Sequence, residues 1–232
     1  MGSGMAGTNS RGRMAGIGTA RLPDPLVDLR STVKRALDIV FSLLGLAALW
    51  PVLALIGMSI FLTSGPPAIF SQERVGRGGR PFRLLKFRTM TSLKGAEAGL
   101  FEPGSRARVT PFGRFLRAYK IDELPQLWNV LMGEMSLVGP RPEIRKWVDV
   151  YPERWRKVLS VRPGITDPAS LHYRNEEEIL AASPDPEKAY RDVILPHKLD
   201  FYERYADNVG PFRDFGVLMR TLSRILQRGQ GR

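Results

Sequence analysis

The sequence contains no cysteine and only two histidines, His172 and His197, among its 232 residues. Without cysteine the protein has no disulfide bonds, no thiolate nucleophile and no cysteine-bound zinc. The histidines are far apart in the sequence and form no HExxH pair, so we expect ordinary structural roles for them rather than a metal site. The absence of cysteine also suits a protein on the cytosolic side of a membrane.

Negative charge is also scarce, because 35 lysines and arginines face only 23 aspartates and glutamates, and the formal net charge is +12. An excess of this size indicates a polyanionic partner, which could be nucleic acid, an anionic membrane surface or a phosphorylated ligand. Nucleic acid is not expected, because no RNA- or DNA-binding motif is visible. The stretch to about Ala20 is rich in Gly, Ser, Thr and Arg, and we predict a disordered basic tail over residues 1–32.

Charge is missing altogether from Ile39 to Leu62, a length that would suffice to cross a bilayer. Two features argue against a plain spanning helix. Pro51 lies near the middle and would kink the helix, and both flanks of the segment are basic, although positive residues stay cytoplasmic. The pattern therefore predicts a re-entrant membrane helix hairpin over residues 33–63, kinked at Pro51, that enters and leaves through the same leaflet.

Asp38 lies at the start of this segment and is expected near the membrane interface, where it could pair with Lys34 or Arg35. A kinked single span is the first alternative to the re-entrant hairpin, and a buried pair of soluble helices is the second. The re-entrant arrangement is preferred because it keeps both basic flanks in the cytoplasm.

Two strand-like runs, residues 67–75 and 81–90, flank a GRGGR turn and predict a β-hairpin. On the second run Lys86 and Arg88 share one face and are separated by a single residue. Such a pair of cations could bind a diphosphate or contact anionic lipid. The alternative is an edge strand that carries its charges for solubility.

A helix is predicted after Thr110-Pro111, which form an N-cap and a first-turn proline. Arg117 lies off the apolar stripe of this helix, five residues before Asp122, and could approach the same site as that carboxylate. The stripe itself is expected in the core. It consists of Phe112, Phe115, Leu116 and Tyr119.

Two adjacent carboxylates, Asp122 and Glu123, come directly before Leu124-Pro125. Proline is favoured at the first position of a helix, so the pair is expected at a helix N-terminus, where the dipole favours the ionised form. An ionised carboxylate can serve as a nucleophile or as a Mg²⁺ ligand, and the alternative is a simple capping acid. Further on, a proline on each side of Arg141 gives a rigid loop suited to presenting that guanidinium to an anion.

Several motifs that run from Lys34 to Thr166 resemble, in order, those of the bacterial sugar transferase family, the monotopic polyprenyl-phosphate phosphoglycosyl transferases. They are KRALD, FSQERVGRGGRPFRLLKFRTM, TPFGRFLR, DELPQLWNVLMGEMSLVGPRP and RPGIT. The resemblance implies transfer of a sugar 1-phosphate from a UDP-sugar to undecaprenyl phosphate with release of UMP. It also implies a place at the cytoplasmic face of the bacterial inner membrane, at the first membrane step of glycan assembly.

The resemblance further implies roles for individual residues. Asp122 matches the nucleophile that forms a covalent phosphosugar intermediate, and Glu123, together with Asp122, would hold Mg²⁺. The substrate-binding residues expected from it and from the basic pattern are Lys86, Arg88, Arg117, Arg141 and Arg162. Expected partners are the UDP-sugar, undecaprenyl phosphate and inner-membrane lipids, with downstream glycosyltransferases and a homodimer as further expectations.

The predicted fold is α+β, with a mostly helical catalytic domain over residues 64–232 that contains one short β-hairpin. The re-entrant helix precedes this domain. An amphipathic helix from Phe212 to Arg228 ends it and is expected in the membrane interface, with packing on the core as the alternative.

The stretch DPASL at residues 167–171 departs from the family pattern, where many relatives have Thr-Gly-x-Ala-Gln, and this leaves the recognition of the sugar open. Two other functions compete with sugar phosphate transfer. A non-catalytic basic membrane adaptor would keep its function when Asp122 is replaced by Asn. A membrane diphosphatase would release sugar phosphate into water without a lipid acceptor.

Overall fold

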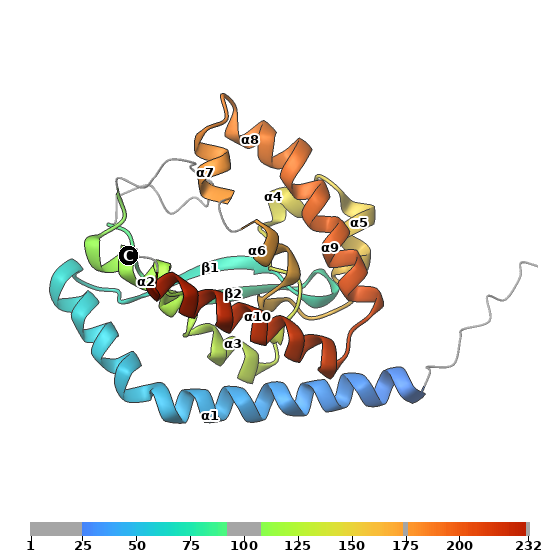
Figure 1. Cartoon of the computed structure of the whole chain (residues 1–232), viewed down its shortest axis with the longest axis horizontal. Coiled ribbons are helices and arrows are strands. Elements are labelled where there is room, and N and C mark those ends of the chain that lie inside the picture. The colour runs from blue at the N-terminus through green and yellow to red at the C-terminus, as the bar shows by residue number, and fades with distance from the viewer. Residues whose placement is uncertain (1–24, 92–107, 174–175, 231–232) are drawn as a thin grey trace, which may run out of the picture.

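The computed structural model describes residues 25–91, 108–173 and 176–230, and its longest element is helix α1 (Pro25–Ser64) (Figure 1). Residues 25–32 are thus helical rather than part of a disordered tail, and the rest of that predicted tail lies outside the described residues. Pro51 lies inside α1, which continues through it, and Figure 1 shows the helix axis changing direction part-way along. A proline removes one backbone hydrogen bond and displaces the preceding turn, which accounts for such a bend.

α1 is therefore one bent helix and not two helices joined by a loop, and its re-entrant path through a membrane stays a prediction. From Arg30 to Ser64 it is long and apolar enough to cross a bilayer, and only 6% of the most apolar window is buried. The alternative of a buried soluble helix pair is wrong, because the large apolar side chains of this helix face outward. They include Phe41, Leu44, Trp50, Leu55 and Leu62. An exposed apolar surface of this extent fits a lipid environment.

The predicted β-hairpin is confirmed. Strands β1 (Ile69–Val75) and β2 (Pro81–Phe87) pair antiparallel, and a 3-10 turn over Arg77–Gly79 joins them. A second small sheet pairs β3 (Ser136–Val138) with β4 (Gly164–Thr166) in parallel. The backbone of β4 approaches the residue after β3 closely: a Cβ on Gly164 would lie 2.0 Å from the amide nitrogen of Gly139, so glycine is required at position 164.

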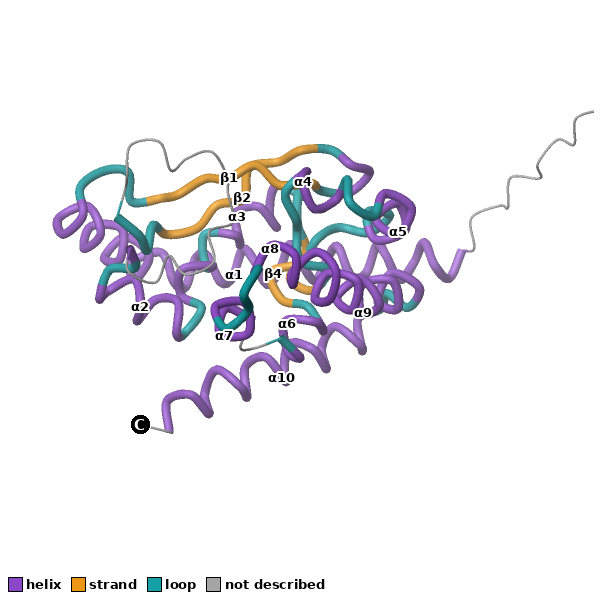
Figure 2. Tube along the Cα trace, turned by 90° about the horizontal axis from the view of Figure 1, so that it is seen from above, coloured by secondary structure: helices purple, strands orange, loops and turns teal. Residues whose placement is uncertain are grey.

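Helices make up most of the remaining chain, as predicted. They are α2 (Pro111–Ala118), the 3-10 turn η3 (Ile121–Glu123), α3 (Gln126–Met132), α4 (Arg145–Val148), α5 (Pro152–Val158), α6 (Pro168–His172), α7 (Glu176–Ala181), α8 (Pro186–Ala189), the π-helical turn η4 (Tyr190–Ile194), α9 (Leu195–Asp207) and α10 (Pro211–Gln230). Figure 2 shows the β-hairpin along one edge of the molecule and α10 along the opposite edge. The largest core cluster joins α4, α5 and α9 through Trp147, Trp155, Leu199 and Tyr202.

The apolar stripe predicted on α2 is only partly buried, and so are the apolar residues that recur at helical spacing along α3. Phe115 of α2 was expected in the core but is 51% exposed, while Leu116 beside it is fully buried. On α3, Trp128 and Met132 are about half exposed, and the buried face of this helix is formed by Gln126, Asn129 and Val130. α3 thus turns a largely polar face toward the β-hairpin and an apolar face toward α1 and the outside.

Candidate active site

Asp122 and Glu123 lie in the 3-10 turn η3, between α2 and α3, and the side chain of each is almost completely buried. Lys120 enters this turn with φ of +58°, and α3 begins only at Gln126, with Pro125 as its N-cap. The carboxylates therefore precede the α-helix by a turn instead of capping it. No side-chain cap is formed at Lys120 or at Pro125, so the alternative in which Asp122 is a capping acid is wrong.

Glu123 is held as an anion by two cations. Its Oε1 atom lies 2.7 Å from Nη2 of Arg141 and 3.5 Å from Nζ of Lys120. Burial alone would raise the pKa of Glu123, but the charges of Arg141 and Lys120 outweigh it and lower the pKa to about 2. The lone pairs of Oε1 are engaged in these contacts, so Glu123 is a fixed negative charge and a poor nucleophile.

Asp122 has the opposite electrostatic balance. Burial raises its pKa above the ordinary value and the adjacent charge of Glu123 raises it further, against the weaker effects of Lys120, Lys86 and Arg117. Its Oδ1 atom is buried and has no hydrogen-bond partner in the part of the chain that the structure describes. An oxygen that is neither paired nor hydrogen-bonded keeps its lone pair for a substrate or a metal ion, so Asp122 is the better nucleophile of the two.

Three of the predicted cationic residues gather around these carboxylates. Burial first, and then the charges of Arg74, Arg141 and Arg117, lower the pKa of Lys86 to about 8, while Asp122 opposes the effect. The Nε atom of Arg117 donates to Oγ1 of Thr89 at 2.9 Å, which fixes that guanidinium above the end of β2. Lys86, Arg117 and Arg141 therefore surround Asp122 and Glu123 with positive charge suited to a diphosphate.

The other two predicted substrate-binding residues lie elsewhere. β2 ends at Phe87, and the guanidinium of Arg88 donates to carbonyl oxygens at the end of α1, at 2.6 Å from Ser64 and 2.9 Å from Pro66. Arg162 donates from Nε to the carbonyl of Gly133 at 3.0 Å, at the far end of α3 from the carboxylates. Both arginines bind carbonyl oxygens at the C-terminal ends of helices, α1 and α3, and the structure does not bring them to Asp122.

The family model described as "Bacterial sugar transferase" matches residues 29–228. The chain belongs to this family of sugar transferases. It is an enzyme of the phosphoglycosyl transferase class.

Three relatives illustrate what this sugar transferase resembles. A UDP-glucose:undecaprenyl-phosphate glucose-1-phosphate transferase of Caulobacter vibrioides is 46% identical over 209 residues, which cover 88% of this chain and 73% of that protein. A UDP-N-acetylgalactosamine-undecaprenyl-phosphate N-acetylgalactosaminephosphotransferase of Aeromonas hydrophila is 34% identical over 88% of this chain and 45% of that protein. A UDP-glucose:undecaprenyl-phosphate glucose-1-phosphate transferase of Escherichia coli is 38% identical over 72% of this chain, but only 37% of that protein.

Residues 34–38 of α1, with the sequence KRALD, contact the catalytic domain of the sugar transferase through three side chains. Asp38 is buried and accepts from the amide of Leu137 in β3 at 3.1 Å, so it does not form the predicted pair with Lys34 or Arg35. Lys34 instead lies 2.5 Å from Oδ2 of Asp214 in α10. Arg35 donates to the carbonyls of residues 130 and 131, at 2.7 Å and 3.1 Å, and so caps the C-terminal end of α3.

The sequence analysis did not identify two further buried carboxylates, Asp214 and Asp167. Asp214 lies in a helix whose pattern is apolar and basic, and it is buried together with Tyr205, whose hydroxyl is 2.7 Å away. Asp167 is fully buried, caps α6 by accepting from the amide of Ser170 at 2.8 Å, and raises the pKa of Arg141 together with Glu123. Its position directly after the RPGIT motif was the available signal.

The two carboxylates Asp122 and Glu123 are suitable ligands for Mg²⁺. No group of three or more metal-ligating side chains exists among residues 25–91, 108–173 and 176–230. Mg²⁺ is usually held by one or two carboxylates together with substrate phosphates and water, which requires no larger cluster. The buried Oδ1 of Asp122, which has no partner in these ranges, and the ionised Glu123 beside it supply such a pair.

Proposed function

We propose that this sugar transferase moves a sugar 1-phosphate from a UDP-sugar to undecaprenyl phosphate and releases UMP, at the cytoplasmic face of the bacterial inner membrane. The observation that supports it best is the buried Oδ1 of Asp122, which has no partner among the described residues and lies beside an ionised Glu123 and three cations. The names of the relatives support the same substrates.

In the first half-reaction a carboxylate oxygen of Asp122 attacks the β-phosphorus of the UDP-sugar. A P–O bond forms to Asp122 and the bond from the β-phosphorus to the bridging oxygen breaks, so UMP leaves with that electron pair. The sugar phosphate remains on Asp122 as an acyl phosphate ester. In the second half-reaction a phosphate oxygen of undecaprenyl phosphate attacks the same phosphorus and Asp122 leaves as a carboxylate.

The cations around Asp122 fit this chemistry, because phosphoryl transfer needs positioning and charge stabilisation more than proton transfer. Arg141 and Arg117 would bind phosphoryl oxygens through their planar guanidinium groups, and Lys86 would act as a point charge. Glu123 and Asp122 would hold Mg²⁺, which would neutralise charge on the diphosphate when bound.

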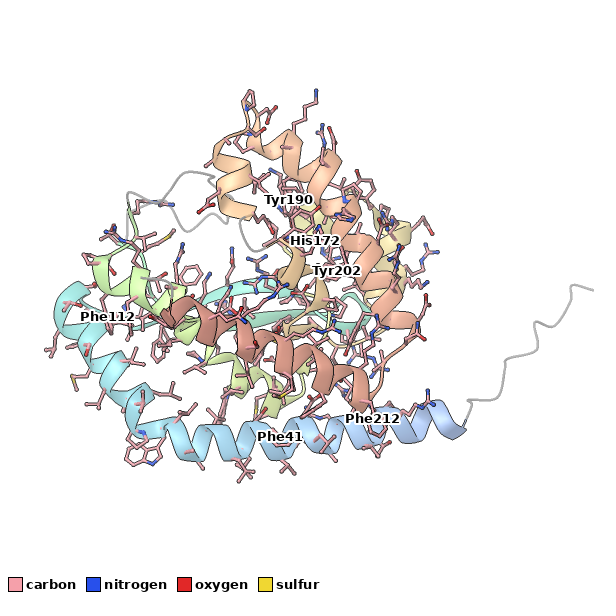
Figure 3. All side chains as sticks on the ribbon, viewed as in Figure 1. Phe41, Phe112, His172, Tyr190, Tyr202 and Phe212 are labelled. Atoms are coloured by element: carbon pink, nitrogen blue, oxygen red, sulfur yellow. The ribbon has the colours of Figure 1, made fainter. Side chains whose placement is uncertain are left out.

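Exposed apolar side chains on several elements support the proposed membrane position. Phe41 of α1 and Phe212 of α10 lie on the same lower side of the molecule in Figure 3. α10 buries Asp214 and Val217 and turns a set of apolar residues outward, which is the pattern of a helix in the membrane interface. The set comprises Phe212, Phe215, Met219 and Leu222. Together with Phe115 and Trp128, they would keep Asp122 near the lipid phosphate.

The decisive experiment compares UMP release by wild-type enzyme, Asp122→Asn and the exposed control Asp149→Asn, across a panel of UDP-sugars with undecaprenyl phosphate. We expect Asp122→Asn to lose roughly 10³-fold or more, because an amide cannot form the acyl phosphate, and the control to keep wild-type activity. Without a lipid acceptor, the wild-type enzyme should release one UMP per active site and gain the mass of one sugar phosphate.

Two results would contradict the proposal. Full turnover by Asp122→Asn would exclude that residue as the nucleophile. Continuous UMP release without any lipid acceptor, with free sugar phosphate as the second product, would show a diphosphatase instead.

A further inference from the structure

The loop that carries Arg141 is held by backbone hydrogen bonds at both of its ends. Glu143 follows Pro142 directly, and its backbone carbonyl accepts from the amide of Val75 in β1 at 2.9 Å. At the other end of the loop, the carbonyl of Pro140 accepts from the amide of Gly164 at 2.9 Å. The backbone is therefore fixed on both sides of Arg141, to two different sheets.

The carboxylate of Glu143 connects this loop to two further side chains. Its Oε2 atom lies 3.2 Å from Nη1 of Arg74, and the same Nη1 is 3.4 Å from the carbonyl of Pro142. Its Oε1 atom accepts from the hydroxyl of Tyr190 at 2.5 Å. Both carboxylate oxygens are thus occupied, and Glu143 is largely buried, so its side chain has one stable orientation.

Tyr190 comes from a distant part of the chain and from an unusual piece of backbone. It begins the π-helical turn η4 between α8 and α9, in the upper helical part of the molecule in Figure 3. π-turns are uncommon and are often found at functional sites, because they shift the side chains that follow them. The ring of Tyr190 is 2% exposed and packs against Trp147 at 4.8 Å, so its hydroxyl is held in place against Glu143.

Arg74 links the same network to the charges of the site. It is close enough to Lys86 to lower the pKa of that lysine, as Arg141 also does. The negative charge of Glu143 therefore offsets the positive charge of Arg74, which lies close to Lys86 and Arg141. Without it, Arg74 would be left buried beside two like charges, which is costly in a region that excludes water.

We propose that Glu143 and Tyr190 are positioning residues for Arg141. The hydroxyl of Tyr190 fixes the carboxylate of Glu143, this carboxylate and Arg74 fix the Pro142 end of the loop, and the loop presents Arg141 to the diphosphate of the UDP-sugar. The inference rests on the proposed function, because it assigns the bound diphosphate to Arg141, and it adds two residues that do not touch the substrate, of which Tyr190 is distant from Arg141 in the sequence.

The test uses the full-length enzyme and Tyr190→Phe, which removes one oxygen and keeps the buried ring. The first half-reaction is followed as a burst of UMP at varied UDP-sugar concentration, and binding of UDP with Mg²⁺ is measured by calorimetry. We expect KM for the UDP-sugar and Kd for UDP to rise by about tenfold, with kcat within about twofold, because a hydrogen bond to a charged group is lost and the chemistry is unchanged. KM for undecaprenyl phosphate should stay the same.

Tyr205→Phe is the matched control, since Tyr205 is also buried and its hydroxyl lies 2.7 Å from the carboxylate of Asp214 and 2.9 Å from the carbonyl of Val138 in β3, and forms no hydrogen bond with Glu143 or Arg74 among the described residues. Both variants should lose similar thermal stability, but only Tyr190→Phe should change UDP binding. A merely structural role would lower the number of active sites in the burst and leave KM and Kd unchanged, and that result would overturn the inference.

A double-mutant cycle with Arg141→Lys separates the inference from the proposed function. If Tyr190 acts through Arg141, its substitution should have little further effect on UDP binding in the Arg141→Lys background, whereas additive effects would overturn the inference. A wild-type enzyme that binds UDP but releases no UMP would refute the proposed reaction and leave this cycle as the test of the network. Absence of UDP binding by the wild-type enzyme would refute both.

Discussion

Lys86 and Glu123 are both largely buried beside Asp122, and the pKa of each is lowered for a different reason: burial is the main cause at Lys86, whereas at Glu123 the charges of its partners outweigh burial. The pKa of Glu123 falls to about 2, whereas burial and three neighbouring arginines lower the pKa of Lys86 to about 8. In the free enzyme Lys86 is therefore protonated below about pH 8 and becomes neutral above it. The site loses one positive charge across a range in which an ordinary lysine would keep it.

We predict that kcat/KM for the UDP-sugar falls as pH rises through about 8, because kcat/KM reports ionisations of the free enzyme. Lys86→Arg should move this fall to higher pH, since a guanidinium stays charged. The measurement is the pH profile of UMP release for both enzymes. Loss of fold is not the cause of such a fall: the unfolded chain binds more protons at Lys86 in this range, so the contribution of Lys86 to stability rises with pH. Superimposable profiles would exclude Lys86 as the titrating group.

The sequence-based predictions were correct for some of these residues, and local geometry explains why they were wrong for others. Lys86 and Arg88 alternate as if on one strand face, but β2 ends at Phe87, so alternation stops before Arg88 and its side chain turns to the end of α1. The helix predicted to begin at Pro125 begins at Gln126, and Asp122 lies in a separate 3-10 turn before it rather than in its first turn. Burial, which a sequence does not show, then decides its pKa.

At the scale of elements, α3 shows why apolar periodicity did not predict its orientation. The stripe that contains Leu127 and Trp128 marks one face, but a stripe does not say whether that face meets a protein core or a membrane. The opposite face is buried because Asn129 satisfies the backbone of β2, accepting from the amide of Leu85 at 3.0 Å and donating to the carbonyl of Arg83 at 2.8 Å. α3 is therefore held by polar contacts on one side and lies against α1 on the other.

Arg35 should stabilise the junction of α1 and α3 more than its place in a basic flank implies. Its guanidinium bonds two carbonyls at the C-terminal end of α3, where the helix dipole is negative. We predict that Arg35→Gln lowers the stability of the folded domain by about 1–2 kcal/mol, because these charged hydrogen bonds are lost. Thermal unfolding in detergent or nanodiscs measures the effect, with the exposed Arg30→Gln as control. Equal unfolding temperatures for the two variants would show that the contacts contribute little.

At the scale of the whole molecule, both halves of α1 contact the same catalytic domain. Before the bend, Lys34, Arg35 and Asp38 bind α10, α3 and β3. Beyond it, Ile56 and Ile60 pack on Phe87 and Leu116. A single folded domain cannot lie on both sides of a bilayer, so these contacts favour a helix that dips into one leaflet over a kinked single span. The sequence suggested this arrangement from its two basic flanks alone, and the contacts give an independent reason for it.

The lack of native cysteine makes the path of α1 directly testable, because each introduced cysteine reports one position. We predict that Ser31→Cys and Thr63→Cys, one near each end of the apolar part, react with a membrane-impermeant maleimide in inverted vesicles and not in intact spheroplasts. Trp50→Cys, at a side chain that is 65% exposed on the protein but faces lipid in this arrangement, should react in neither. UMP release by each variant shows that the fold is kept. Labelling of one end from the periplasmic side, with the other end reactive only in inverted vesicles, would establish the kinked span instead, and the contacts made by one half of α1 would then have to break in the membrane.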